Sequence, residues 1–269
     1  QKWMILPRGS GMLVFDDNGT IDNPSDDRVT RLGFTAGNGG IVGTDVYSMA
    51  EDQDGEIWVG TDQGISVFYC AENIFTPGAC DAQQILIQQD GYTQILMGTQ
   101  SVTCIAIDGA NRKWIGTEEG GVFLMSADGQ KQLAHFDVTN SPLLSNDITS
   151  LAINQKTGEI FFGTTKGLVS YRGEAIEGQD QMGDVYAFPN PVTHDYHGPI
   201  AITGLVKDAD VRIADVTGNV VYQTKALGGQ AIWDGNNFKG ERAATGVYLV
   251  FITNEDGTQK AITKILLIN

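Results

Sequence analysis

The sequence predicts an all-β protein: a partial or small β-propeller followed by an immunoglobulin-like seven-stranded β-sandwich. A short unit of aromatic, apolar, Gly and Thr residues recurs through the first part of the chain, and the C-terminal third consists of short alternating runs between turn residues. No helical period is evident in either part. We therefore expect propeller blades over 1–175, a linker over 176–184 and the sandwich over 185–269.

The repeated unit predicts the blades. Each full copy follows a strand-like run, and the aromatic anchors recur roughly every 50 residues, a period typical of propeller blades with three or four short strands. The aligned copies are residues 56–65, 113–122 and 160–169, with a degenerate copy at Lys2–Leu6. The preceding runs are Val46–Ala50, Val102–Ala106 and Ile148–Ala152, and the anchors are Trp3, Trp58, Trp114 and Phe161.

The repeat is incomplete at both ends. The first copy starts at its second strand, and the last, ending near Arg172, has no fourth strand. Because propellers typically contain about four to eight blades, we expect about three to four blades forming an open arc of a larger propeller. The alternative is a compact four-bladed ring in which the opening strand completes the last blade.

Seven strands are predicted for the sandwich, with hairpin turns wherever glycine accepts positive φ. Both faces of Val247–Thr253 are apolar, which predicts a central strand covered on both sides. The predicted strands are Val185–Phe188, Ile200–Gly204, Ala209–Asp215, Val220–Thr224, Gln230–Trp233, Val247–Thr253 and Lys260–Ile268.

A set of motifs is distributed along this predicted sandwich. It consists of Pro189, Asn190, Pro191, Asp215, Gly218, Trp233, Asp234, Gly235, Gly240, Gly246, Tyr248 and Lys264. The combination resembles the C-terminal sorting domain of the bacterial type IX secretion system, which implies that the C-terminus is an export signal. The simpler interpretation is an immunoglobulin-like accessory domain, because fold alone does not define function.

The propeller units resemble the periplasmic repeats named for two-component regulators. Followed directly by the sorting motifs, they resemble the PorZ-like family of type IX secretion accessory proteins in Bacteroidetes. That resemblance implies a non-enzymatic protein, exported through the periplasm to the outer-membrane surface of a Gram-negative bacterium. It also implies association with the sortase PorU and with PorV and PorQ, and binding of anionic lipopolysaccharide.

The charge is strongly negative and uneven. The net charge is −16; the first 180 residues carry 24 acidic and 10 basic side chains, and the remainder carry 9 and 7. Such a chain is unsuited to binding along a nucleic-acid backbone. An anionic lipopolysaccharide would need local cations. The sandwich offers Lys207, Arg212, Lys225, Lys239 and Arg242, whose simpler interpretation is scattered solvated cations.

Cysteine spacing predicts one disulfide and no metal site. Cys70 and Cys80 flank a loop that resembles an insertion at the edge of a blade, and a disulfide there suits an oxidising compartment. Cys104 lies in an apolar run and is expected to be a buried free thiol.

The search for catalytic residues and cofactor motifs yields none. His135, His194 and His197 are the only histidines, and none stands beside a nucleophile in a recognisable motif. His194–His197 could hold a metal, but a solvated loop is the expected reading. The calcium-like carboxylates of Asp52–Glu56 coincide with a hairpin turn of the repeat, and the Gly-Thr steps lack the lysine and helix of a phosphate loop.

Three functional classes remain open from the sequence. The first is the secretion component just described. The second is a secreted cargo protein, either an adhesin or an enzyme, that carries the sorting domain only as a tag. The third is the periplasmic sensor propeller of a two-component regulator. No run of about 18 apolar residues predicts a transmembrane helix.

Overall fold

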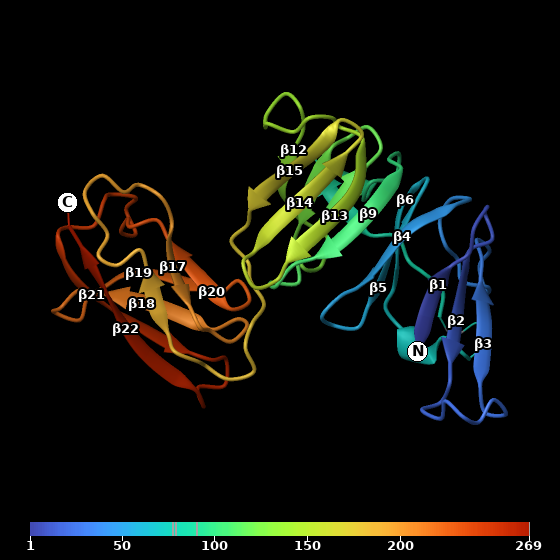
Figure 1. Ribbon diagram of the computed structural model, residues 1–269, viewed down its shortest axis with the longest axis horizontal. Coiled ribbons are helices and arrows are strands. Elements are labelled where there is room, and N and C mark those ends of the chain that lie inside the picture. The colour runs from blue at the N-terminus through green and yellow to red at the C-terminus, as the bar shows by residue number, and fades with distance from the viewer. Residues whose placement is uncertain (77, 79, 90, 269) are drawn as a thin grey trace. The chain divides into compact units, whose positions relative to one another are not determined.

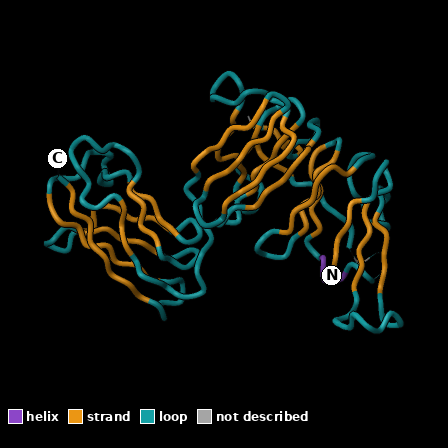
Figure 2. Tube along the Cα trace, viewed as in Figure 1, coloured by secondary structure: helices purple, strands orange, loops and turns teal. Residues whose placement is uncertain are grey.

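The computed structural model describes residues 1–76, 78, 80–89 and 91–268. Residues 77 and 79, in the loop between the paired cysteines, and residue 269, at the predicted end of the sandwich, lie outside the described part. The chain forms two compact units, one of 1–107, 111–153 and 160–171, and one of 108–110, 154–159 and 172–269. Strands dominate both (Figure 2), so the predicted all-β class is confirmed.

The first unit consists of small antiparallel sheets that follow one another along the chain (Figure 1). The first blade contains β1 (Lys2–Ile5), β2 (Met12–Asp16) and β3 (Arg28–Leu32); the second contains β4 (Val46–Glu51), β5 (Ile57–Thr61) and β6 (Gly64–Phe68). The third contains β9 (Val102–Ile107), β10 (Lys113–Thr117), β11 (Val122–Met125) and β12 (Gln132–Phe136), and the fourth β13 (Ile148–Asn154), β14 (Glu159–Thr164) and β15 (Gly167–Arg172).

The second blade has an insertion in place of a fourth strand. The 3-10 turn η1 (Ala71–Asn73) and the hairpin of β7 (Leu86–Gln89) and β8 (Tyr92–Ile95) follow β6 before the third blade begins. In the described part of the chain, β1 pairs with β2 and does not join the sheet of β13, β14 and β15. The four-bladed ring closed by the opening strand is therefore not formed.

Aromatic anchors fill the junctions between blades, as the repeat predicts. Trp58 is fully buried among residues of the second and third blades, and Trp114 is fully buried among residues of the third and fourth. Trp3 packs against Phe68, with ring centroids 5.4 Å apart. In the fourth blade the buried aromatic is Phe162 rather than the predicted anchor Phe161. Strand alternation turns Phe162 toward the third blade and Phe161 away from it.

A buried ion pair links the second and third blades. Lys113 Nζ lies 2.8 Å from Asp52 Oδ2, and neither side chain is exposed. The ammonium also donates to the backbone carbonyls of Asn111 and Ala127 and lies 4.7 Å from the Trp58 ring centroid. Burial alone would raise the pKa of Asp52, but the Lys113 hydrogen bond and backbone amides hold that pKa below its usual value. The calcium-like loop thus serves the blade junction.

The C-terminal sandwich has two antiparallel sheets packed over one core. One sheet has the order β16 (Tyr186–Phe188), β17 (Ile200–Thr203), β20 (Gln230–Trp233), and the other β19 (Val220–Lys225), β18 (Asp210–Ala214), β21 (Gly246–Thr253), β22 (Lys260–Leu267). All seven predicted strands are present, with ends within one residue or so of the prediction.

The central strand β21 is covered on one face, not on both. It lies in the interior of its sheet, as predicted, between β18 and β22. Tyr248, Val250 and Ile252 are buried in the core, whereas Val247 and Phe251 are exposed on the opposite face. The expectation of cover on both sides was wrong, because no element among the described residues of the sandwich packs over the outer face of this sheet.

The segment expected to be a linker is hydrogen-bonded along the sandwich. Gly183 N donates to Gly204 O, Gln179 N donates to Leu205 O, and Gly229 N donates to Ile176 O. The described part of the chain contains no helix with the length and apolar character that a membrane crossing requires.

Candidate functional site

Asn190, at the centre of the Pro-Asn-Pro motif, binds the edge of the last strand. Its Nδ2 donates to Lys264 O at 2.9 Å, and its Oδ1 accepts from Leu266 N at 3.0 Å. Val192 then continues the contact by exchanging backbone hydrogen bonds with Leu266 O and Ile268 N. The Asn190 side-chain amide therefore makes the hydrogen bonds that a neighbouring strand would make. The motif satisfies the backbone groups along this part of the β22 edge.

The Asp215 and Gly218 motif residues form the turn between β18 and β19. Asp215 Oδ1 accepts from Thr217 Oγ1, Thr217 N and Asn219 N. The Thr217 hydroxyl bond lowers the pKa of Asp215. Gly218 has a φ of 90°, a conformation that glycine adopts without strain. These residues define a turn and offer no reactive group.

The Trp-Asp-Gly motif is held by an arginine. Arg242 Nη1 donates to Asp234 O at 3.0 Å, and its Nη2 donates to Tyr196 O at 3.1 Å. A Cβ on Gly235 would lie 2.2 Å from that guanidinium, so glycine is needed both for space and for its φ of 79°. Trp233 is fully buried and donates from Nε1 to Asn236 O.

Arg242 also lines a polar cleft of about 630 Å³ on the sandwich, with His194, His197, Asp234 and Asn236. Both histidines lie on the exposed loop predicted from the sequence. Among the residues that the structure describes, no three His, Cys, Asp or Glu side chains gather closely enough to hold a metal ion. The cleft presents hydrogen-bonding groups of both charge signs.

The remaining motif residues have structural roles of different strength. Tyr248 Oη donates to Ala244 O at 2.7 Å near the start of β21, the tyrosine corner of immunoglobulin-like sandwiches. Gly240 has a φ of 78° in a turn, whereas Gly246 has neither a positive φ nor a neighbour that a Cβ would touch. Nothing in the structure explains glycine at 246.

The five candidate cations are dispersed rather than gathered in one cluster. Arg212 pairs with Asp210 at 3.1 Å, and Lys225 lies opposite Asp210 on the neighbouring strand. Lys207 lines a different cleft, together with the acidic Glu255. Lys239 lies in a turn, and Arg242 binds the backbone as described above.

The propeller has a cleft that the sequence analysis missed. It measures about 760 Å³ and lies at the starts of the first strands of three blades. Burial raises the pKa of Tyr47 there, helped by Asp45, Asp62 and Glu118. The repeats could have indicated this cleft, because residues at the same position of successive repeats, such as Tyr47, Thr103 and Thr149, line it. Its lining residues are Tyr47, Thr103, Glu118, Glu119, Asp147, Ile148, Thr149 and Thr165.

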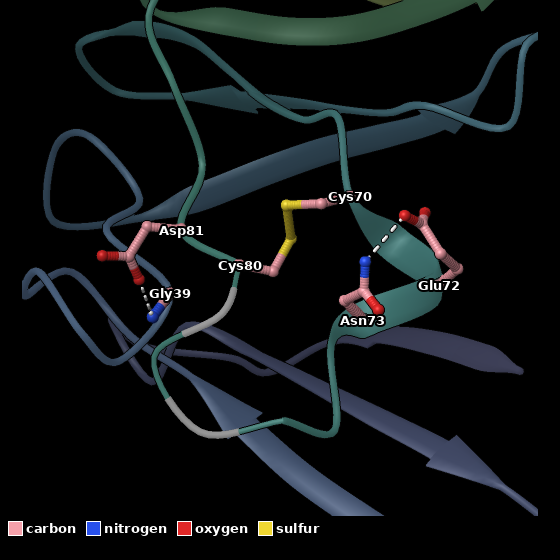
Figure 3. The surroundings of a disulfide bond; sticks show 6 residues. All are labelled: Gly39, Cys70, Glu72, Asn73, Cys80 and Asp81. Atoms are coloured by element: carbon pink, nitrogen blue, oxygen red, sulfur yellow. Dashed lines mark hydrogen bonds between the residues drawn. A yellow bond between two sulfur atoms is a disulfide. The ribbon is translucent and has the colours of Figure 1, made fainter.

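Cys70 and Cys80 form a disulfide within the insertion of the second blade (Figure 3). Asp81 follows it and accepts from the backbone amides of Gly37 and Gly39, on the loop after β3. The disulfide loop therefore fastens the second blade to the first. Cys104 is a half-buried free thiol, and burial raises its pKa.

Residues 186–268 match the family described as the secretion system C-terminal sorting domain, and residues 40–63 match the two component regulator propeller. The solved structure of PorZ from Porphyromonas gingivalis is 32% identical over 99% of this chain and 37% of its own, with a TM-score of 0.63. The similarity to PorZ extends over nearly the whole length of this chain. The resemblance predicted from the motifs is confirmed.

Other solved structures match more weakly. Latent PorU from Porphyromonas gingivalis is 19% identical over 40% of this chain and 12% of its own, with a TM-score of 0.24. The extracellular domain of a one-component system from B. thetaiotaomicron is 12% identical over 97% of this chain and 54% of its own, with a TM-score of 0.35. No curated protein sequence matches the chain. The chain spans little more than a third of the length of PorZ, and its sorting domain associates it with type IX secretion.

Proposed function

We propose that this chain is a non-enzymatic surface component of the type IX secretion and cell-surface attachment machinery, with residues 185–269 as its export signal. One observation carries the proposal: a sorting-domain match and similarity to PorZ over 99% of the chain coincide. PorZ is described as an essential bacterial surface component of the type IX secretion system. The proposed location is the outer-membrane surface of a Gram-negative bacterium, reached through the periplasm.

Within this proposal, the blades of residues 1–175 are part of a larger propeller and act as a scaffold, and 176–184 join them to the sorting domain. The partners proposed are PorU, PorV and PorQ. The loop clefts of a rigid scaffold are suitable places for such contacts, because binding residues concentrate on loops that a scaffold holds in place.

Anionic lipopolysaccharide is the proposed ligand of the sandwich. The observation that supports it is the polar cleft in which Arg242 meets two histidines. His194→Ala with His197→Ala should weaken binding of purified lipopolysaccharide by the full chain if the cleft holds it. Lys207→Gln, Lys225→Gln and Lys239→Gln test the predicted cations outside the cleft, and unchanged binding in both sets would reject the proposal. Arg242 is better left intact in this test, because it also holds the Trp-Asp-Gly turn.

A cargo protein is the second candidate, and the sorting domain itself favours it, because the same tag would serve a secreted adhesin or enzyme. A sensor propeller is the third, favoured by the match of residues 40–63 to two component regulator propellers. Both differ from the proposed secretion component, because loss of a cargo protein or of a sensor would leave the export of unrelated sorting-domain proteins unchanged.

The export signal is tested by removing residues 185–269 in the native bacterium and measuring where the truncated protein accumulates. We expect it in the periplasm. The converse test attaches residues 176–269 to a periplasmic reporter, which should then reach the cell surface. Surface delivery of the truncated protein would refute the proposal.

A further inference from the structure

The outer face of the four-stranded sheet of the sandwich is apolar at its centre. On β21 and β22, cross-strand neighbours share a face, so Phe251 stands beside Ile262 and Val247 beside Leu266. Ile262 is 66% exposed and Phe251 39% exposed. Leu249 lies half-buried between these pairs, opposite Lys264. Contiguous exposed apolar side chains of this kind mark interaction surfaces.

Cations surround this apolar centre. The four strands contain one carboxylate, Asp210, which already binds Arg212. Lys260 and Lys264 lie along β22, and Lys225 ends β19; all three are exposed. The strands of this face therefore carry more cations than carboxylates, in a chain whose net charge is −16. We name it the basic-apolar face, defined by Arg212, Lys225, Val247, Leu249, Phe251, Lys260, Ile262, Lys264 and Leu266.

We propose that the basic-apolar face docks on a protein surface with an apolar centre and an acidic rim, belonging to the export machinery. The inference rests on the proposed function and names a contact surface for the sorting domain. Charge complementarity selects the partner: the cations would repel a second copy of the same face, whereas carboxylates opposite them would speed association and fix orientation. A flat apolar centre inside a polar rim is the common anatomy of protein interfaces.

Part of the β22 edge is closed to strand addition, which favours a contact on the outer face. Asn190 and Val192 occupy the backbone groups of Lys264, Leu266 and Ile268 at the free edge of β22. A partner strand would have to displace them. The outer face, in contrast, is available without any rearrangement of the sandwich.

The test uses the full chain in the native bacterium. Phe251→Ser with Ile262→Ser removes the apolar centre, and Lys260→Glu with Lys264→Glu reverses the rim. We expect each pair to reduce the fraction of the protein found on the cell surface by about tenfold or more. Central contacts dominate interface affinity, and reversed charges would repel an acidic rim. Matched controls outside the face, Leu168→Ser on β15 and Lys156→Glu in the turn between β13 and β14, should be exported as the unaltered chain is, since both side chains are exposed.

Folding is measured separately, by thermal unfolding of each purified variant. Both double variants should keep the transition of the unaltered chain, since the buried face of β21 and β22 is untouched. A photo-crosslinking residue at position 262 should yield one discrete protein adduct in cells, lost with Lys260→Glu and Lys264→Glu. Normal export of both folded double variants would overturn the proposal.

Two other occupants would also overturn it. If sedimentation velocity shows a dimer that Phe251→Ser with Ile262→Ser dissociates, a second copy occupies the face. If the full chain binds vesicles containing anionic lipid, the lysine reversals abolish binding and no protein adduct forms, the face binds a membrane. If removal of residues 185–269 blocks export while the face variants do not, the face inference fails and the export-signal proposal stands.

Discussion

The propeller blades and the sandwich bury their apolar residues in different ways. The sandwich has one core shared by both sheets, whereas the blades have three separate clusters, one at each junction. Two of these junctions have a further individual link, a disulfide loop between the first two blades and the Asp52–Lys113 pair between the second and third. Repeat architectures are stabilised by such neighbour contacts, so damage to one junction stays local, whereas damage to the sandwich core affects the whole domain.

The largest loss of stability should come from a charge placed in the sandwich core. Val250→Asp places an unpaired carboxylate at a fully buried position and should cost about 5 kcal/mol or more of unfolding free energy. Leu249→Asp, one residue away on the outer face, should cost much less. Denaturant unfolding of both variants measures the difference. Equal losses would mean that both faces of β21 are covered.

The next largest effect should come from the blade junction. Lys113→Met leaves the Asp52 carboxylate buried without its partner, which should cost about 3–5 kcal/mol. Because the damage is local to one junction, fluorescence of the propeller tryptophans should change while the sandwich transition stays in place. Simultaneous unfolding of both units would contradict the local character of the damage.

Acid provides a second measurement on the same pair. The pKa of Asp52 is lowered in the folded protein, so its stabilising contribution is present above the usual value of 3.8 and is lost as the pH falls through the lowered pKa. Thermal unfolding followed downward from pH 5 should show a loss that Lys113→Met reduces. If Lys113→Met loses stability with falling pH as the unaltered chain does, other carboxylates cause that loss.

The disulfide should have a smaller effect on the first junction. Replacing Cys70 and Cys80 with Ser should cost about 2–3 kcal/mol, since the bond closes a short loop. The unaltered chain in reductant should unfold as the variant does, and the variant should not respond to reductant. A variant as stable as the oxidised chain would show that the loop holds the blades without the bond.

The smallest effect is expected at the edge of the sandwich. Asn190→Ala removes two hydrogen bonds to β22 and should cost about 1–2 kcal/mol. Asn190→Asp keeps the acceptor for Leu266 N but sets a carboxylate oxygen against Lys264 O, so it should lose at least as much as Asn190→Ala. Hydrogen exchange at the Leu266 amide reports this contact directly. Unchanged exchange in both variants would argue against the edge-binding role.

Local pattern predicted the strands well and the side-chain roles less well. Alternation and turn residues placed all seven sandwich strands, and cysteine spacing indicated the pair at 70 and 80. The Asp52–Lys113 pair was missed because its members are 61 residues apart and meet only when blades stack. The binding of β22 by Asn190 was missed for the same reason. The uncovered face of β21 was mispredicted because apolar composition does not distinguish a core from a docking surface.

The central claim, that this chain belongs to the secretion machinery rather than to its cargo, is tested most directly in a strain that lacks it. The measurement is the surface fraction of unrelated proteins that carry sorting domains. The account predicts that they accumulate in the periplasm, and that the full chain restores their export. Normal export of those proteins would contradict the account and identify the chain as a passenger.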